Sequence, residues 1–441
     1  MSQLIQVEER SPAAVSDAIA RAVPPEFWIA SGCVLSRAAG DTAWTLHPGD
    51  SVGISRVKTT LGDVTLQIRP KLAGADVLFL ADYAYGQRHE ALKMLADNVS
   101  LEAVTQDPTA CLLMWHALNV DRFASRWLRR GYATRTRVLE GKVRGKILVD
   151  QYMKNHISTG DAGRIPCKII ERTQDTPNNR ILKAGLRYIA TLSHTLPVPA
   201  ARRAVLKQVN ATLPKFSGVA DVRATPAEVR ATSVRGPHRH YASVLDATIA
   251  LLSHRFVGDN LGRQTTQAFL WQMPVLFQEA LRGIIAADSV DFSLDSSGPG
   301  RARVHDAHGT RRRTSKVDPD LVLRTATGDA YFLLDTKYKA ALPRGPGSDD
   351  TIELGTKQRI KISSADIYQA VAYRQHEKWN APRTGLLYPV CLEKNETLPK
   401  PMEIRGFGSP IDVIFVDIGR FARNNLASFR SHLRHSNVLA T

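Results

Sequence analysis

Two runs of residues on either side of Thr327-Gly328 constrain the fold of this chain more than any other segment. Apolar strand-forming residues around such a dipeptide predict a β-hairpin. If Ala326 faces Asp329 across the turn, Asp320 and Asp335 lie directly opposite each other, with Cβ atoms about 4.5–5.5 Å apart. Two carboxylates at this separation repel each other. The segment therefore predicts a hairpin that brings two acids together at a functional site.

A divalent cation between the two acids would turn this repulsion into ligation, and Mg²⁺ prefers oxygen ligands. Lys337 follows Asp335 by two residues, so strand alternation places it on the same face. Its ammonium group can orient or activate a water molecule beside a bound phosphate. The backbone carbonyl of Thr336 is a third candidate metal ligand. The alternative is a surface hairpin in which Asp335 and Lys337 form an ion pair worth less than about 1 kcal/mol.

Length and patterning predict several domains. The chain has 441 residues, which suggests two or three domains. We expect a β-rich partner-binding region over residues 1–100, a helical and basic middle region over 101–235, and a catalytic domain over 236–441. The fold class is α/β, with an α+β N-terminal part and a central mixed sheet flanked by helices at the C-terminus.

Local patterns predict individual elements within these regions. The expected elements are a hairpin over 52–68, a helix that begins at Asp107-Pro108, two short strands around Glu140-Gly141-Lys142, a helix over about 265–287, a helix over 365–375, and strands near 385–390 and 411–416.

The charge of the chain favours a polyanionic partner. Lys and Arg number 59 against 42 Asp and Glu, a formal net charge of +17, and such an excess attracts nucleic acid. Nine of the basic residues lie within 121–147, and a second cluster precedes the hairpin. This second cluster comprises Arg301, Arg303, Arg311, Arg312, Arg313 and Lys316.

The four cysteines are scattered, which predicts reduced thiols rather than a disulfide framework. The first ten residues turn acidic and contain no apolar signal segment. No run approaches the ~18 apolar residues that a membrane-spanning helix needs. We therefore expect a soluble, cytoplasmic protein.

Several motifs resemble those of known nucleases. Pro319-Asp320 with Asp335-Thr336-Lys337 resembles the PD-(D/E)xK nuclease signature, and Gln369 with Tyr373 resembles the Gln-x-x-x-Tyr helix motif of RecB-like nucleases. Positions 369 and 373 are one helical turn apart and share a face. The resemblance implies that Asp320, Asp335 and Lys337 are catalytic, that Gln369 and Tyr373 support the site, and that Glu279 on an upstream helix is a further metal ligand. An exposed acid on an amphipathic helix is an equal alternative for Glu279.

The whole order of motifs resembles McrC, the nuclease subunit of McrBC modification-dependent (5-methylcytosine) restriction systems, which act in phage defence. Further segments that carry this resemblance are Ile68-Arg-Pro-Lys71, Leu139-Glu-Gly141, Asn179-Arg180-Ile-Leu-Lys183 and Leu276-Phe-Gln-Glu279. The chain departs from the family pattern at Gln278, which stands before Glu279 where an acid usually follows Leu-Phe directly.

The resemblance also implies partners. The chain has no complete phosphate-binding loop, because Gly141-Lys-Val-Arg-Gly145-Lys146-Ile147 has the wrong glycine spacing and ends in Ile. An McrC-like subunit would instead bind an McrB-like AAA+ GTPase hexamer, which hydrolyses GTP, and would cleave double-stranded DNA that is expected to be cytosine-modified. Residues 121–147 would contact either DNA or the acidic lining of the partner. The rival functions are a stand-alone RecB-like nuclease in repair and a non-catalytic adaptor that activates a GTPase ring.

Overall fold

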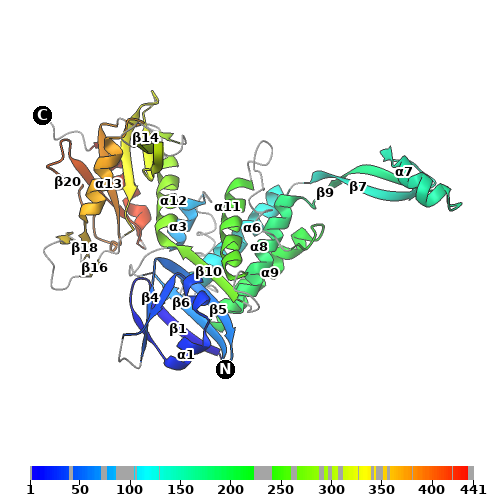
Figure 1. The fold of residues 1–441 in the computed structure, drawn as a ribbon, viewed down its shortest axis with the longest axis horizontal. Helices are drawn as coiled ribbons and strands as arrows, with labels where there is room; N and C mark the ends of the chain where they lie inside the picture. The colour runs from blue at the N-terminus through cyan, green and yellow to red at the C-terminus, as the bar shows by residue number, and fades with distance from the viewer. Residues whose placement is uncertain are drawn as a thin grey trace. The chain divides into compact units, whose positions relative to one another are not determined.

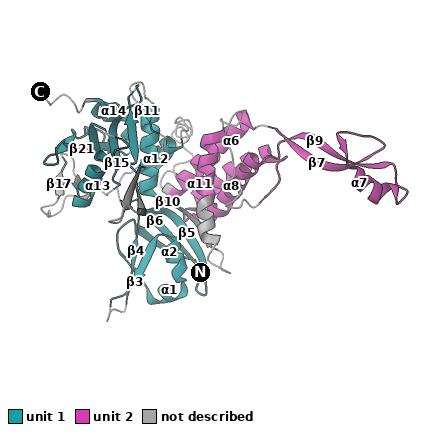
Figure 2. Cartoon of the chain, turned by 45° about the horizontal axis from the view of Figure 1, so that its top comes forward, with its two compact units in different colours: residues 1–94, 261–441 teal, residues 95–260 magenta. Residues whose placement is uncertain are grey.

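The computed structural model describes residues 2–38, 43–70, 77–85, 104, 107–128, 130–222, 241–259, 266–287, 293–295, 300–305, 311–325, 327–338, 342–343, 351–354, 358–379, 381–419 and 421–435. The chain forms two compact units, residues 1–94 with 261–441 and residues 95–260 (Figure 2). The expected boundaries at 100/101 and 235/236 lie outside the described residues. Most of the first and third expected regions falls in one unit, whereas residues 95–100 and 236–260 belong to the other.

The N-terminal part of the first unit contains a four-stranded sheet of order β1-β6-β5-β10. Its strands are β1 (Ser2–Glu8), β5 (Ser51–Thr59), β6 (Gly62–Arg69) and β10 (Thr266–Gln272). The expected hairpin over 52–68 is confirmed, with Thr59 opposite Gly62. A smaller sheet of β2 (Ala13–Val15), β3 (Cys33–Ser36) and β4 (Trp44–Pro48) and the helices α1 (Asp17–Ala22) and α2 (Pro25–Ala30) lie in the same part.

The helix expected over 265–287 is wrong in its first third. Residues 266–272 form β10, which pairs with β5, and the helix α12 (Met273–Ala286) begins only after it. Pro274 lies in the first turn of α12, where a missing N–H costs nothing. α12 packs against α3 (Val77–Ala84) so closely that a Cβ on Gly283 would lie 2.0 Å from the Tyr83 carbonyl oxygen.

The C-terminal part of the first unit contains a six-stranded mixed sheet of order β11-β14-β15-β19-β21-β20. β15 (Ala330–Thr336), β19 (Arg383–Val390) and β21 (Ile411–Asp417) are parallel, and β14 (Leu321–Arg324) runs antiparallel to β15. The outer strands are β11 (Ser293–Leu294) and β20 (Met402–Ile404). α13 (Ser364–Arg374) follows β15 in the chain and contacts β15 and β19. The expected mixed α/β architecture is confirmed (Figure 1).

Shorter elements complete this part of the chain. They are the paired strands β12 (Gly300–His305) and β13 (Arg311–Val317), a sheet of β16 (Leu342–Pro343), β18 (Gln358–Lys361) and β17 (Thr351–Glu353), the 3-10 helix η5 (Ala422–Asn425) and the helix α14 (Leu426–His435). The second basic cluster therefore lies on β12 and β13.

The register of the β14–β15 hairpin is the one that the sequence predicts. Leu321 faces Leu334 and Leu323 faces Phe332, so Asp320 and Asp335 lie at facing ends. The turn itself is longer than two residues, because the Thr325 N–H donates to the Asp329 carbonyl and the register shifts after Leu323. Gly328 has a φ of +92°, which favours glycine.

The second unit contains a group of helices and a β-sheet arm. The helices are α6 (Pro108–Trp127), α8 (Pro177–Ser193), α9 (Pro199–Thr212), the 3-10 helix η3 (Leu213–Phe216) and α11 (Ala242–Asp259). Asp107 caps α6 by accepting hydrogen bonds from the backbone N–H groups of Thr109 and Ala110, which confirms the predicted start of this helix.

The arm of the second unit, residues 131–173, consists of β7 (Gly131–Glu140), β8 (Lys146–Ile147), α7 (Val149–Tyr152), the π-helix η2 (Met153–Ile157) and β9 (Arg164–Thr173). Figure 1 shows its two long strands running away from the helices of this unit. The two strands expected around 140–142 are present as β7 and β8, but they do not pair with each other, because both pair with β9. β7 pairs along its whole length with β9, a partner too distant in sequence for local patterns to reveal.

None of the helices that the structure describes is long and apolar enough to cross a membrane.

Candidate functional site

The two predicted acids and the lysine meet at the carboxyl end of β15. Asp335 is the penultimate residue of this strand, Lys337 directly follows it, and Asp320 directly precedes β14. Asp320 Oδ2 accepts hydrogen bonds from the Thr336 backbone N–H at 2.7 Å and from Thr336 Oγ1 at 2.6 Å. These bonds tie the ends of the two strands together. Carboxyl ends of parallel strands are the usual place for a functional site in α/β sheets.

Lys337 is the centre of the group. Its Nζ lies 2.5 Å from Asp335 Oδ2 and donates a hydrogen bond of 2.7 Å to Gln369 Oε1. Gln369 in turn donates through Nε2 to the Tyr373 hydroxyl. The structure therefore brings the helix motif on α13 to the lysine of the hairpin. These contacts join four of the residues predicted from sequence, and Asp320 is tied to the same strand end through Thr336.

Asp366 belongs to this group and was not among the predicted site residues. Its Oδ1 lies 3.5 Å from Lys337 Nζ, and its Oδ2 accepts hydrogen bonds from Ser363 N and Oγ and from the Tyr388 hydroxyl. Ser363 and Asp366 form a capping box at the start of α13. The Ser-x-x-Asp spacing is a visible sequence signal for such a box, but the contact with Lys337 depends on how α13 packs against β15.

Burial makes the site electrostatically unusual. Asp335 is 3% exposed. This burial, together with the nearby Asp320 carboxylate, raises the pKa of Asp335 to about 6, although Lys337 opposes the shift. Burial also raises the pKa of the Tyr373 hydroxyl, so this group is a neutral donor at physiological pH. The two aspartates thus lie near enough for the Asp320 charge to act on the pKa of Asp335.

The raised pKa of Asp335 predicts a pH-dependent difference in stability. The native protein binds a proton on Asp335 up to about pH 6, whereas the unfolded chain releases it near pH 4. The native state therefore binds more protons in this window, and the unfolding free energy decreases as pH rises. We expect the metal-free Asp335→Asn variant to lack this decrease, roughly 3 kcal/mol between pH 4 and 7. Urea unfolding of both proteins at pH 4.5, 6 and 8 measures it; parallel pH profiles would contradict the assignment.

The predicted metal ligands differ in how the structure places them. Asp320 and Asp335 face each other, but Glu279 on α12 is half-exposed and lies 3.7 Å from Arg282. Arg282 donates a hydrogen bond of 2.7 Å to the Asp320 carbonyl oxygen, so it stands between Glu279 and the hairpin. The part of the chain that the structure describes contains no group of three or more His, Cys, Asp or Glu residues able to hold a metal. The roles of Glu279 and of the Thr336 carbonyl stay predictions.

The mixed sheet and the polar group at the end of β15 define the chain as an α/β protein with a candidate catalytic site. A family model described as "McrBC 5-methylcytosine restriction system component" matches residues 46–389. The match spans more than half of the chain, and the chain belongs to this family.

Solved structures are similar at low sequence identity. A chain of the half-complex from the tetradecameric assembly of Thermococcus gammatolerans McrB AAA+ hexamers with bound McrC is 16% identical, with a TM-score of 0.56 over 98% of this chain and 99% of that chain. A chain of the Thermococcus gammatolerans McrBC complex is also 16% identical, with a TM-score of 0.42 over 64% and 87%. The first likeness supports the fold. No curated protein matches the chain.

Proposed function

We propose that this protein is the nuclease subunit of a GTP-dependent, modification-dependent restriction complex, that it hydrolyses DNA phosphodiesters with Mg²⁺, and that it stimulates a partner AAA+ GTPase. The observation that carries the proposal is the meeting of Asp320, Asp335 and Lys337 at one strand end. Membership of the McrBC family supports it. We further propose that the site has the PD-(D/E)xK arrangement, which the motif spacing favours.

The donor set suits a hard divalent cation. Asp320 and Asp335 are close enough for one carboxylate to raise the pKa of the other, and Mg²⁺ is usually held by one or two carboxylates together with water and substrate phosphate. Because Asp320 Oδ2 accepts two hydrogen bonds from Thr336, Oδ1 would be the ligand. When bound, the ion would polarise a phosphate and make a water molecule more acidic.

Lys337 would act on the attacking water. Asp335, Gln369 and Asp366 hold its ammonium group from different elements, which fixes the position of the charge and limits its motion. A fixed cation beside the scissile phosphate stabilises the negative charge that develops in the transition state. Gln369 and Tyr373 act indirectly, by holding Lys337 and closing the site on the side of α13.

The arm of the second unit supports a protein partner. Seven large apolar side chains of residues 131–173 are at least 41% exposed. They are Tyr132, Val138, Val143, Val149, Met153, Ile157 and Ile170. Binding to the phosphate backbone needs cations but no exposed apolar groups, whereas protein interfaces bury apolar and aromatic residues within a polar rim. We therefore favour the partner, rather than DNA, as the contact of the basic residues that lie on the arm.

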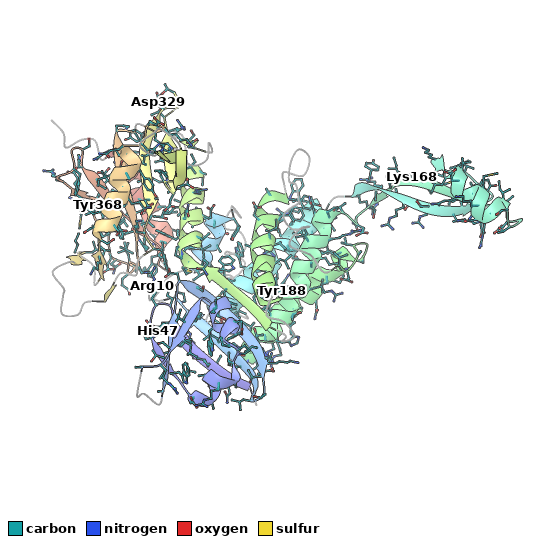
Figure 3. The ribbon with its side chains drawn as sticks, in the orientation of Figure 1. Arg10, His47, Lys168, Tyr188, Asp329 and Tyr368 are labelled. Atoms are coloured by element: carbon teal, nitrogen blue, oxygen red, sulfur yellow. The ribbon has the colours of Figure 1, made fainter. Side chains whose placement is uncertain are left out.

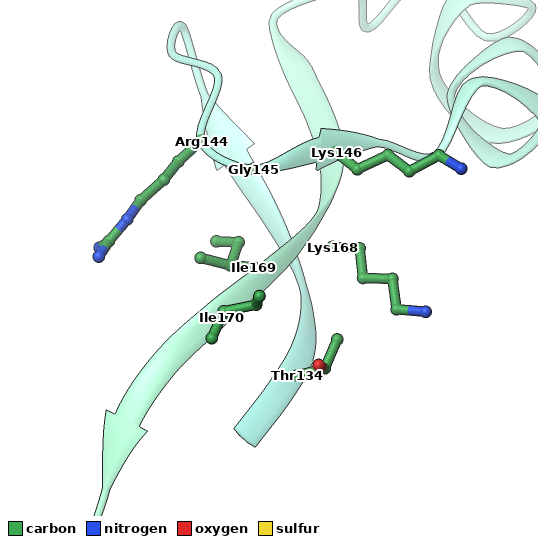
Figure 4. A pocket seen from close by; sticks show the side chains of 7 residues that line it. All are labelled: Thr134, Arg144, Gly145, Lys146, Lys168, Ile169 and Ile170. Carbon is green, nitrogen blue, oxygen red and sulfur yellow. The ribbon is translucent and has the colours of Figure 1, made fainter. Parts of the chain in front are cut away.

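A pocket on the arm is also lined by both basic and apolar side chains. It has a volume of about 380 Å³ and is lined by Thr134, Arg144, Gly145, Lys146, Lys168, Ile169 and Ile170. Figure 4 shows Lys146 and Lys168 extending to the same side of the sheet, with Ile169 and Ile170 nearer to Arg144. This combination suits an acidic segment that also carries an apolar side chain, as the acidic lining of a partner ring would. The solved structure with the higher TM-score contains McrB AAA+ hexamers with bound McrC, which supports a ring as partner.

We expect Ile170→Glu to weaken binding of the AAA+ partner by at least about tenfold, because it puts a charge at an apolar contact of the pocket. The measurement is co-purification with the partner and stimulation of its GTPase. Val275→Glu on α12 is a matched control, since Val275 is 56% exposed and Ile170 is 65% exposed. Equal partner binding by both variants would contradict the role of the arm.

The proposed function as a whole is tested with the complex of this chain and an McrB-like AAA+ GTPase. We expect cleavage of methylated DNA that needs GTP and Mg²⁺ and stops when EDTA is added. GTP hydrolysis without any cleavage in Mg²⁺ or Mn²⁺ would favour the adaptor function instead. Cleavage by the isolated chain, without a partner or GTP, would favour a stand-alone nuclease.

A further inference from the structure

A buried hydrogen bond joins the N-terminal sheet to the residue that follows Lys337. The Tyr338 hydroxyl donates to Glu9 Oε1 at 2.9 Å, and both residues are in the first unit. Glu9 is 1% exposed and Tyr338 is 4% exposed. A buried carboxylate costs free energy unless it is hydrogen-bonded or paired. The proposed catalytic roles do not use Glu9, so its burial calls for another explanation.

The backbone beside Glu9 is held in a strained conformation. Arg10 has a φ of +54° and is the one non-glycine residue with positive φ in the described part of the chain. This left-handed conformation is unfavourable for an L-residue. It is fixed by hydrogen bonds from the Arg10 N–H to the carbonyls of Pro48 and Gly49 and by an ion pair between Arg10 and Asp50. Figure 3 shows Arg10 at the edge of the N-terminal sheet that lies toward the C-terminal part of the unit.

The segment around Arg10 and Asp50 also contacts α12, the helix that reaches Asp320. The Asp50 carbonyl oxygen accepts a hydrogen bond from the N–H of Met273, the first residue of α12. Along α12, the Phe277 ring packs on the Tyr338 ring with centroids 5.9 Å apart, and Arg282 holds the Asp320 carbonyl. The segment from Glu9 to Asp50 is thus connected both to Tyr338 and to Asp320, the two ends of the catalytic hairpin.

We propose that Glu9 and Tyr338 are positioning residues for the nuclease site: through their hydrogen bond the N-terminal sheet holds the chain at Lys337 in the geometry that cleavage needs. The inference rests on the proposed function and deepens it. Lys337 lies one residue beyond the end of β15, where its backbone N–H still donates to the Leu387 carbonyl of β19 but the β15 ladder has ended. The Tyr338–Glu9 bond adds a second restraint directly after Lys337, and Arg282 of α12 restrains the chain at Asp320.

The alternative is that the Glu9–Tyr338 bond only stabilises the fold, and kinetics separate the two roles. Displacement of a catalytic group by about 1 Å lowers the rate of the chemical step by up to about 10²-fold, while substrate binding is kept. We therefore expect Tyr338→Phe and Glu9→Ala each to lower kcat for DNA cleavage about tenfold, with KM for DNA unchanged. Glu9→Gln keeps an acceptor for the Tyr338 hydroxyl, and we expect it to retain most of the activity.

The experiment measures cleavage by the purified complex over a series of DNA concentrations, which gives kcat and KM, for wild type, the two single variants, their double variant and Glu9→Gln. If the two residues act through one hydrogen bond, the double variant is no slower than either single variant. Tyr241→Phe is the matched control, because the buried Tyr241 hydroxyl donates to Asn179 Oδ1 at 2.8 Å in the second unit. It removes a bond of the same kind and should lower the melting temperature without changing kcat.

The outcomes distinguish this inference from the proposed function. Cleavage at the wild-type rate by Tyr338→Phe and Glu9→Ala, in a complex that Lys337→Ala inactivates, would overturn the positioning role and leave the nuclease function standing. A double variant whose loss is the product of the two single losses would also overturn it. A wild-type complex that cuts no DNA under any tested condition would overturn both the positioning role and the nuclease function.

Discussion

The Lys337→Ala variant is expected to cleave DNA about 10²- to 10⁴-fold more slowly than wild type, the range for loss of a positioned acid–base group. The reason is specific to this site. Nζ lies within 3.5 Å of carboxyl oxygens of Asp335 and Asp366 and donates to Gln369, so three side chains on two elements converge on the atom that alanine removes. Assembly with the partner should stay intact, because the proposed docking surface is on the arm.

The measurement is single-turnover cleavage by the purified complex, with GTP hydrolysis recorded in parallel. Asp320→Ala should have the same effect, since it removes a proposed metal ligand. Lys394→Ala replaces an exposed lysine of the same domain and serves as control. Full cleavage by either Lys337→Ala or Asp320→Ala would reject the assignment of the site.

The Arg383→Met variant is expected to lose about 3–5 kcal/mol of unfolding free energy, the typical cost of leaving one partner of a buried ion pair alone. Arg383 and Asp412 are 7% and 6% exposed and join β19 to β21 at 2.7 Å. The guanidinium also donates to the Tyr331 hydroxyl and the Leu433 carbonyl and lies 3.9 Å from the centroid of the Phe332 ring. Burial raises the pKa of Asp412, and Arg383 opposes this shift.

Urea unfolding measures this loss, and a second variant tests its cause. In Arg383→Met/Asp412→Leu both charges are gone, so most of the stability should return. Arg405→Met is the control, because its pair with Glu403 is largely exposed and such pairs contribute about 0–1 kcal/mol. A double variant as unstable as Arg383→Met would show that packing of the guanidinium, rather than the unpaired Asp412, causes the loss.

The parts of the site that depend on residues close together in the sequence could be predicted. The facing positions of Asp320 and Asp335 follow from a turn signal and from strand alternation, and they hold although the turn is longer than expected. The shift of register after Leu323 occurs on the far side of the hairpin from the acids, so it leaves their pairing unchanged. Gln369 and Tyr373 were predicted from their resemblance to a nuclease helix motif, and their shared face follows from helical spacing, which is local.

The contacts that join distant segments could not be predicted. Glu9 and Tyr338 are separated by 329 positions, and neither lies in a motif. The strand β10 was mistaken for the start of a helix, because its apolar residues fit both patterns until β5 supplies a partner. β9 was missed as the partner of β7 for the same reason. These features depend on which elements pack together, information that residue spacing does not contain.

The exposed turn of the β14–β15 hairpin is a suitable site for attaching a spectroscopic label. Thr327, Gly328 and Asp329 are exposed, whereas the native thiols of Cys33, Cys111 and Cys167 are buried and that of Cys391 is half-buried. A Thr327→Cys protein would therefore react with a maleimide dye mainly at that position. Because Thr327 lies at the end of the hairpin opposite to Asp320 and Asp335, a dye there would not touch the two acids and could report on DNA binding in real time.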